Sequence, residues 1–237
     1  MADPWFYFAA LAETPERLSL SGAEASHAGG ARRLRAGDRV VLFDGAGMVA
    51  NAQITAATTG RVELALQTRE RRPAPIPLHL ACALPKGDRQ ATLLDMATQL
   101  GMTDFTPLVC EHSVVTPGPN SAPRWQRICL EACKQSRRAH LPRLHAARTP
   151  AEVAREHGAL TLLIADPDGR AFAQAARLTP AGAMLLIGPE GGFTRQEVAA
   201  VRAAGGEPVA LGGSILRVET AAAALLALVA ERLRGAY

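Results

Sequence analysis

The chain lacks the cysteine and histidine patterns that bind metal ions or form structural disulfides. Its four cysteines include no CxxC pair, and its six histidines form neither an HExxH motif nor a Cys/His cluster. We therefore expect no metal site. Cys129 and Cys133 are spaced to share one face of a helix, which favours buried thiols over a disulfide and indicates a reducing compartment.

Long hydrophobic runs are also missing. The longest purely apolar run, residues 221–230, is too short to span a bilayer. Asp3 precedes the apolar stretch 5–10, and no basic region stands before it, which argues against a signal peptide. We expect a soluble, cytoplasmic protein with no membrane partner.

Lysine is nearly absent, because Lys86 and Lys134 are the only two and arginine supplies the rest of the positive charge. The formal net charge is +4. A mild basic excess is typical of proteins that bind polyanions, and it is equally typical of a compositional bias toward arginine. With 237 residues, 48% of them hydrophobic, the chain can form one large domain or two small ones.

The first seventy residues show the short, interrupted apolar runs of a β domain. Strands are expected at 5–9, 39–44, 48–56 and 61–66. Asp44-Gly45 predicts a hairpin turn, and a helical piece is expected at 22–34. We predict a small, mostly β domain over 1–70. The following RERRPAPIP stretch is charged and then proline-rich, which predicts an extended linker at 71–77.

From residue 78 onward, strand and helix patterns alternate, which predicts an α/β domain with a parallel sheet over 78–237. Strands are expected at 78–84, 105–109, 113–116, 160–165, 184–187 and 208–211. Helices are expected at 88–100, 123–138, 149–158, 171–177, 194–205 and 219–234. The 160–165 strand should end at Asp166-Pro167-Asp168-Gly169. Capping boxes at Thr149/Glu152 and Thr194/Glu197 mark two of the helix starts.

Two glycine-rich turns each follow a predicted strand directly. GPEGG (188–192) follows the run 184–187, and Gly212-Gly213 follows the run 208–211. The chain has no Walker motif, and GPEGG comes late in the sheet with a proline where a dinucleotide-binding turn would bend. Ligands of open α/β sheets bind outside the carboxyl ends of the strands. We therefore expect the two turns to be walls of one pocket.

The stretches LIGPEGGFTRQEV (186–198) and LGGSILRVETA (211–221) resemble the SPOUT class of S-adenosylmethionine methyltransferases. More narrowly, they resemble the bacterial family that methylates N3 of a uridine in 16S ribosomal RNA (RsmE type). Supporting stretches are found at His27, 33–38, 86–89, 100–101 and 131–136, so the resemblance spans nearly the whole chain. Family members usually carry Arg-Phe, Glu, Gly and Pro-Arg where this chain has Trp5-Phe6, Lys134, Arg137 and Gly213-Ser214.

The resemblance implies a PUA-like, RNA-binding β-barrel followed by a SPOUT-type parallel sheet whose chain threads a trefoil knot. It implies an enzyme that uses S-adenosylmethionine to methylate N3 of a specific uridine in 16S ribosomal RNA of the small subunit. A homodimer acting on ribosomal RNA or the small ribosomal subunit is also implied. Two alternatives stay open: a ribose 2′-O RNA methyltransferase of the same class, and a non-catalytic RNA-binding factor for ribosome assembly.

The resemblance also implies which residues form the site. The cofactor would be held largely by loop backbone, where glycines leave room for the adenosyl group. The expected cofactor-binding residues are Ile164, Ala165, Ile187, Gly188, Pro189, Glu190, Gly191, Gly192, Leu211, Gly212, Ser214, Ile215 and Leu216.

Two further residues are the expected catalytic groups. Arg217 would stabilise the negative charge on the uracil oxygens, and Glu219 or a water molecule would take the N3 proton. Glu190 or Glu219 could offset the charge of the cofactor's sulfonium, or could instead serve as an acidic residue at a helix start.

Several basic residues are expected to contact RNA phosphates. They are Arg32, Arg33, Arg35, Lys86, Arg137 and Arg138. A basic face that is simply solvated is the alternative for Arg32, Arg33 and Arg35, and likewise for Arg137 and Arg138 on their helix.

Overall fold

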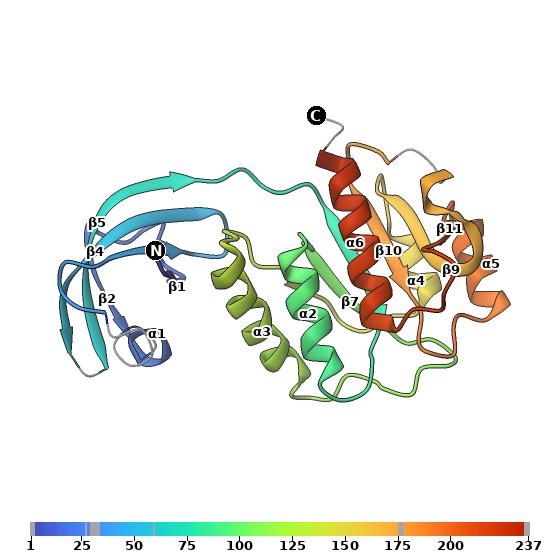
Figure 1. The fold of residues 1–237 in the computed structure, drawn as a ribbon, viewed down its shortest axis with the longest axis horizontal. Coiled ribbons are helices and arrows are strands. Elements are labelled where there is room, and N and C mark those ends of the chain that lie inside the picture. Colours follow the sequence, from blue (N-terminus) through green and yellow to red (C-terminus); the bar gives the residue numbers. More distant parts are fainter. Residues whose placement is uncertain (1–2, 27, 29–33, 59, 175–177, 235–237) are drawn as a thin grey trace. The chain divides into compact units, whose positions relative to one another are not determined.

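A computed structural model describes residues 3–26, 28, 34–58, 60–174 and 178–234 (Figure 1). The chain divides into two compact units. The first contains Met1–Ala74 together with Cys133–Leu141, and the second contains Pro75–Ala132 and Pro142–Tyr237. Arg32 and Arg33 lie outside the described residues.

The first unit is built on a curled five-stranded sheet with the order β1-β3-β4-β5-β2 (Figure 1). Its strands are β1 (Trp5–Tyr7), β2 (Arg17–Ser21), β3 (Arg39–Phe43), β4 (Met48–Thr58) and β5 (Arg61–Arg71), with the helix α1 (Gly22–Ser26) after β2. The pair β1–β3 is parallel, and the other neighbours are antiparallel. The predicted hairpin joins β3 and β4, where the Asp44 carboxylate accepts hydrogen bonds from the backbone N–H groups of Ala46 and Met48.

Strand β2 was not expected from the sequence, although its five residues alternate between exposed and buried positions. Its pairing with β5 is non-local, and a run this short gives little signal without that partner. Leu18 and Leu20 of β2 pack with Leu42, Ile54 and Leu64 in the core of this unit.

The second unit is a six-stranded parallel sheet with the order β11-β9-β10-β6-β7-β8. Its strands are β6 (Leu78–Ala83), β7 (Asp104–Leu108), β8 (Arg143–Leu144), β9 (Thr161–Ala171), β10 (Ala183–Ile187) and β11 (Glu207–Ala210). The parallel sheet predicted from the alternating pattern is therefore confirmed.

The strand expected at 113–116 does not form. The hydroxyl of Ser113 accepts a hydrogen bond from the backbone N–H of Cys110 at 2.9 Å, and the backbone closes a turn there. The apolar pair Val114-Val115 follows this turn without a neighbouring strand. The two-residue strand β8, which was not expected, occupies the sheet edge beside β7 instead.

Helices cover both faces of this sheet (Figure 1). The helices α2 (Arg89–Gln99), α3 (Ser121–Ser136) and α6 (Val218–Arg234) lie on one face, and α4 (Pro150–Arg155) and α5 (Arg195–Ala203) lie on the other. Alternate strand residues explain the division: Leu185 and Ile187 pack with α2 and α6, whereas Met184 and Leu186 pack with α4 and α5. A short 3-10 helix, η2 (Phe172–Gln174), follows β9.

Local signals located several element boundaries correctly. Both predicted capping boxes form: Thr149 and Thr194 accept from the N–H of Glu152 and Glu197, whose carboxylates bond back. In contrast, α3 begins at Ser121, two residues before the proline expected to start it. All four cysteines are buried and none is in a disulfide, which confirms the buried thiols expected at Cys129 and Cys133. Among the described residues, no helix is both long and apolar enough to cross a membrane.

Candidate functional site

A cavity of about 590 Å³ lies at the carboxyl ends of β10 and β11, beside the middle of β9. The turn 188–192 after β10 and the turn 212–216 after β11 both line it, together with residues 165–168 of β9. This end of a parallel sheet is where open α/β folds bind ligands, because the loops converge there without blocking the strand ends.

The β9 wall is a loop inside the strand. Pro208 and Val209 are consecutive in β11, but they pair with Ile164 and Arg170 of β9. Residues 165–169 therefore leave the ladder between two paired positions, and the strand resumes after them. A Cβ on Gly169 would lie 2.6 Å from the backbone of Pro208 and Val209, so this return requires glycine. The sequence predicted that the strand ends at Asp166, but it did not predict that the strand resumes after Gly169.

The β10 wall is held from outside the cavity. The ring of His112 places Nδ1 3.1 Å from the carbonyl oxygens of both Gly191 and Gly192, so Nδ1 must carry the proton and donate. A Cβ on Gly188 would lie 3.0 Å from the ring of Phe193, and one on Gly191 would lie 3.0 Å from His112. A larger residue at either position would therefore be crowded unless the side chain of Phe193 or His112 shifts by a few tenths of an ångström.

The structure brings together nearly all the residues expected to bind the cofactor. Each of them lines the cavity except Ile164, which is fully buried in the core below it. Eight further residues line the cavity: Asp166, Pro167, Asp168, Phe193, Val209, Gly213, Val218 and Ala221. The sequence indicated Gly213, as part of a turn expected to form a wall, and residues 166–168, as the expected end of a strand. The other four had no such signal.

The two expected catalytic residues sit at the start of α6 in different environments. Arg217 is exposed and stands between Leu216 and Val218, both of which line the cavity. Glu219 is buried, with 8% of its surface exposed, and its Oε2 makes no hydrogen bond. Neither side chain is itself part of the cavity lining.

Arg89, the first residue of α2, connects two of the carboxylates considered above. Its Nη2 donates to Glu190 Oε1 at 2.9 Å, and its Nη1 lies 3.7 Å from Glu219 Oε2. The contact joins residues 101 positions apart in the chain. The only sequence signal for Arg89 was its place in the 86–89 stretch that supported the family resemblance.

The charged side chains that line the cavity are all acidic. They belong to Asp166, Asp168 and Glu190. A cavity of this kind attracts cationic ligands and repels polyphosphates, which disfavours a nucleotide phosphate as its occupant.

The expected RNA-binding residues that are described lie in both units. Lys86 is exposed between β6 and α2, and Arg35 is exposed before β3. Arg137 is exposed just after α3, with a φ of 57°, and its carbonyl accepts from Arg72; the neighbouring Arg138 is half-buried. Their contact with RNA stays a prediction.

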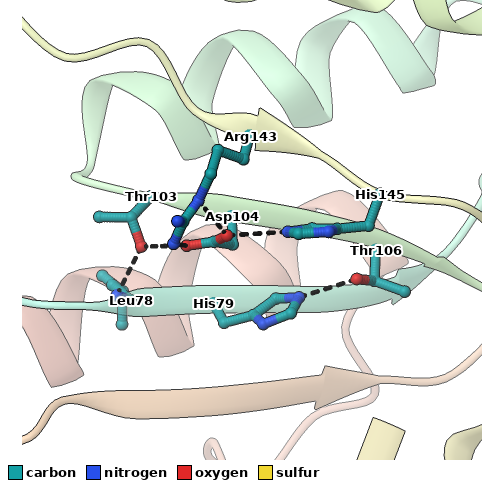
Figure 2. A network of polar contacts seen from close by, with 7 residues as sticks. All are labelled: Leu78, His79, Thr103, Asp104, Thr106, Arg143 and His145. Atoms are coloured by element: carbon teal, nitrogen blue, oxygen red, sulfur yellow. Dashed lines mark hydrogen bonds and ion pairs between the residues drawn. The ribbon is translucent and has the colours of Figure 1, made fainter. Parts of the chain in front are cut away.

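A second polar cluster lies at the amino ends of β6, β7 and β8, at the edge of a smaller cavity of about 200 Å³ (Figure 2). The Asp104 carboxylate accepts hydrogen bonds from Arg143 at 2.8 and 3.0 Å, from His145 at 2.8 Å and from the Thr103 hydroxyl at 2.9 Å. Burial raises the pKa of Asp104, but these donors outweigh it and hold that pKa below its usual value.

His79 faces this cluster. Its Nε2 lies 2.8 Å from the hydroxyl of Thr106, and its ring stacks on that of His145 (Figure 2). Burial lowers the pKa of His79 to about 4. Both Asp104 oxygens are satisfied, and the cluster connects β6, β7 and the segment containing β8. We interpret it as a structural network that joins these strands.

Comparison with known proteins agrees with this architecture. Residues 72–230 match the family model described as RNA methyltransferase domain, and residues 20–67 match the RNA methyltransferase PUA domain. Ribosomal RNA small subunit methyltransferase E of Synechocystis sp. is 36% identical, over 83% of this chain and 67% of that protein.

Two solved structures are similar over nearly their whole lengths. The ribosomal RNA small subunit methyltransferase E of Neisseria gonorrhoeae, bound to S-adenosyl methionine, is 28% identical with a TM-score of 0.86 and covers 96% of each chain. A methyltransferase of Legionella pneumophila in complex with the cofactor SAM is 27% identical with a TM-score of 0.88, covering 100% of this chain and 98% of that one.

The curled β unit, the parallel sheet and the cavity at its carboxyl end thus define a SPOUT-type RNA methyltransferase with a PUA-like domain. Within this class, the chain belongs to the family of the ribosomal RNA small subunit methyltransferase E. The fold class expected from the resemblance is confirmed, while the threading of a trefoil knot stays a prediction.

Proposed function

We propose that this protein uses S-adenosylmethionine to methylate N3 of a specific uridine in 16S ribosomal RNA. The observation that carries the proposal is the cavity at the carboxyl ends of β10 and β11, whose charged lining is wholly acidic and whose walls are glycine turns. Its volume of about 590 Å³ lies in the range of small-molecule sites. The solved relatives bound to the same cofactor support this assignment.

The chain's own groups suit this ligand. The backbone of 187–192 and 211–216, with Ala165, would hold the adenosyl and methionine parts. When bound, the cofactor supplies an electrophilic methyl group on a cationic sulfur. The contribution of the loops is orientation, since reacting atoms must be held about 3 to 3.5 Å apart.

The chemistry at the base requires a cation and a proton acceptor. N3 of uracil is an imide nitrogen, and loss of its proton spreads negative charge onto the two neighbouring carbonyl oxygens. We assign the stabilisation of that charge to the Arg217 guanidinium, which is exposed beside the cavity and, among the described residues, has no ion-pair partner. Glu219 and a water molecule are the two proposed acceptors of the proton.

Substitution of Arg217 tests this assignment. Arg217→Ala should lower methyl transfer to 16S ribosomal RNA by about a hundredfold or more, since a donor that stabilises developing charge is worth that much. Binding of S-adenosylmethionine, measured by calorimetry, should be retained because the side chain does not line the cavity. Arg202→Ala, at an exposed position of α5, is the matched control and should leave both quantities unchanged. Normal turnover in Arg217→Ala would contradict the assignment.

The two alternatives predict different products. Mass spectrometry of digested ribosomal RNA distinguishes 3-methyluridine from a 2′-O-methylated nucleoside. A non-catalytic assembly factor would release no heat with S-adenosylmethionine.

We further propose a cytoplasmic enzyme whose partners are ribosomal RNA or the small ribosomal subunit, contacted in part by Arg35, Lys86, Arg137 and Arg138, and a second copy of the chain. Leu228, an apolar residue of α6 with 44% of its surface exposed, is consistent with such a dimer contact.

A further inference from the structure

The carboxylates in and beside the cavity fall into two groups, because Arg89 contacts two of them, Glu190 and Glu219. Glu190 is paired with Arg89 at 2.9 Å, and Glu219, which is buried, lies 3.7 Å from the same guanidinium. Arg89 is itself only one-third exposed, so solvent screens this three-residue contact only in part. The carboxylates of Glu190 and Glu219 therefore share the single positive charge of Arg89.

The wall formed by β9 is different. Asp166 and Asp168 line the cavity from the loop that leaves β9, and among the described residues no Lys, Arg or His lies within ion-pair distance of either. The Oδ1 atom of Asp166 accepts the backbone N–H of Asp168 at 2.9 Å, which fixes the turn and sets both carboxylates on one short segment. The pinned ends of the loop, at Ile164 and Arg170, hold this segment beside the cavity.

We propose that Asp166 and Asp168, rather than Glu190 or Glu219, provide the negative charge that makes this cavity prefer the cationic cofactor S-adenosylmethionine to its neutral-sulfur product S-adenosylhomocysteine. The inference rests on the proposed function. The two ligands differ only by a methyl group and one positive charge on sulfur, so unpaired carboxylates in the cavity separate them by electrostatics. A preference of this kind also limits inhibition by the product.

Calorimetric titration with both ligands tests the proposal, using the full chain. The measured quantity is the ratio of the two dissociation constants, because a merely structural change in the loop would weaken both ligands together. In the double variant Asp166→Asn, Asp168→Asn, the preference for S-adenosylmethionine should fall about tenfold, equivalent to ~1.4 kcal/mol. The affinity for S-adenosylhomocysteine should stay within about twofold.

Two further measurements sharpen the result. Asp95→Asn, on α2, removes a carboxylate that does not line the cavity and should leave the ratio unchanged. The wild-type ratio should also decrease as salt is raised to about 0.5 M, since partly exposed charges are screened.

An unchanged ratio in the double variant would overturn the inference, and so would an equal loss of affinity for both ligands. A wild-type protein that binds neither ligand would instead refute the proposed function itself.

Discussion

The low pKa of His79 makes the stability of the second unit depend on pH in a defined window. In the unfolded chain this imidazole is protonated as the pH falls through 6.5, whereas in the folded state it stays neutral down to a pH of about 4. Between these values the unfolded state binds more protons, so stability decreases as the pH falls. The full shift corresponds to about 3 kcal/mol, with about 2 kcal/mol lost by pH 5.

Several neighbours act on this imidazole. Burial lowers the pKa most, the Asp104 carboxylate opposes it, and electrostatic interactions with His145 and Arg143 lower it further. Protonation of Asp104 would weaken its ties to Arg143 and His145, but its own pKa is depressed, so that loss occurs at lower pH. The loss of stability caused by His79 therefore occurs between pH 6.5 and about 4, above the pH at which Asp104 is protonated.

Urea unfolding from pH 7.5 to 4 measures the effect. Trp125 packs edge-on against Phe105 in the second unit, and Trp5→Phe removes the tryptophan of the first unit, so fluorescence then reports on the second unit alone. The comparison is between this background and the same background with His79→Gln, which can still bond Thr106 but does not titrate. The difference between the two stability curves should change by about 2 kcal/mol between pH 7 and 5. Parallel curves would refute the reasoning.

Two substitutions test how the walls of the cavity are held. Gly169→Ala should destabilise the second unit by about 1–3 kcal/mol and weaken S-adenosylmethionine binding, because the added Cβ meets the β11 backbone. The control is Gly213→Ala, whose added Cβ meets nothing within 4 Å and should leave stability unchanged in the same urea titration. Thr194→Ala and Thr149→Ala should each lower the free energy of unfolding by about 1 kcal/mol, because each removes a capping box. Only Thr194→Ala should also weaken cofactor binding in calorimetry, since its helix follows the GPEGG loop. Equal effects on binding would show that the cap does not support the loop.

The features that the sequence predicted well are those encoded within a few residues. Thr149 and Thr194 each carry their capping partner three positions on, and the GPEGG turn directly follows its strand. The alternation of strands and helices then predicts a parallel sheet, and the sheet places the turns at one end. Most of the cavity follows from these local signals.

The features that could not be predicted depend on distant partners. Arg89 meets Glu190 across 101 positions, and nothing in the intervening sequence indicates that contact. The run at 113–116 looked like a strand because Val114 and Val115 are apolar, but no strand in the described part of the chain pairs with it. The return of β9 after Gly169 depends on β11, which the chain reaches only at Glu207.

In the interrupted strand β9, different residues set the alignment with the neighbouring strand and line the cavity, two roles that one segment of chain normally has to fill together. Residues on either side of the interruption fix the alignment with β11, through Ile164 opposite Pro208 and Arg170 opposite Val209. Residues 165–168 do not pair with β11, so the ligand in the cavity, and not the alignment of the strands, determines which side chains are suitable there. Substitutions at these four positions can therefore change the lining of the cavity without changing the register between β9 and β11.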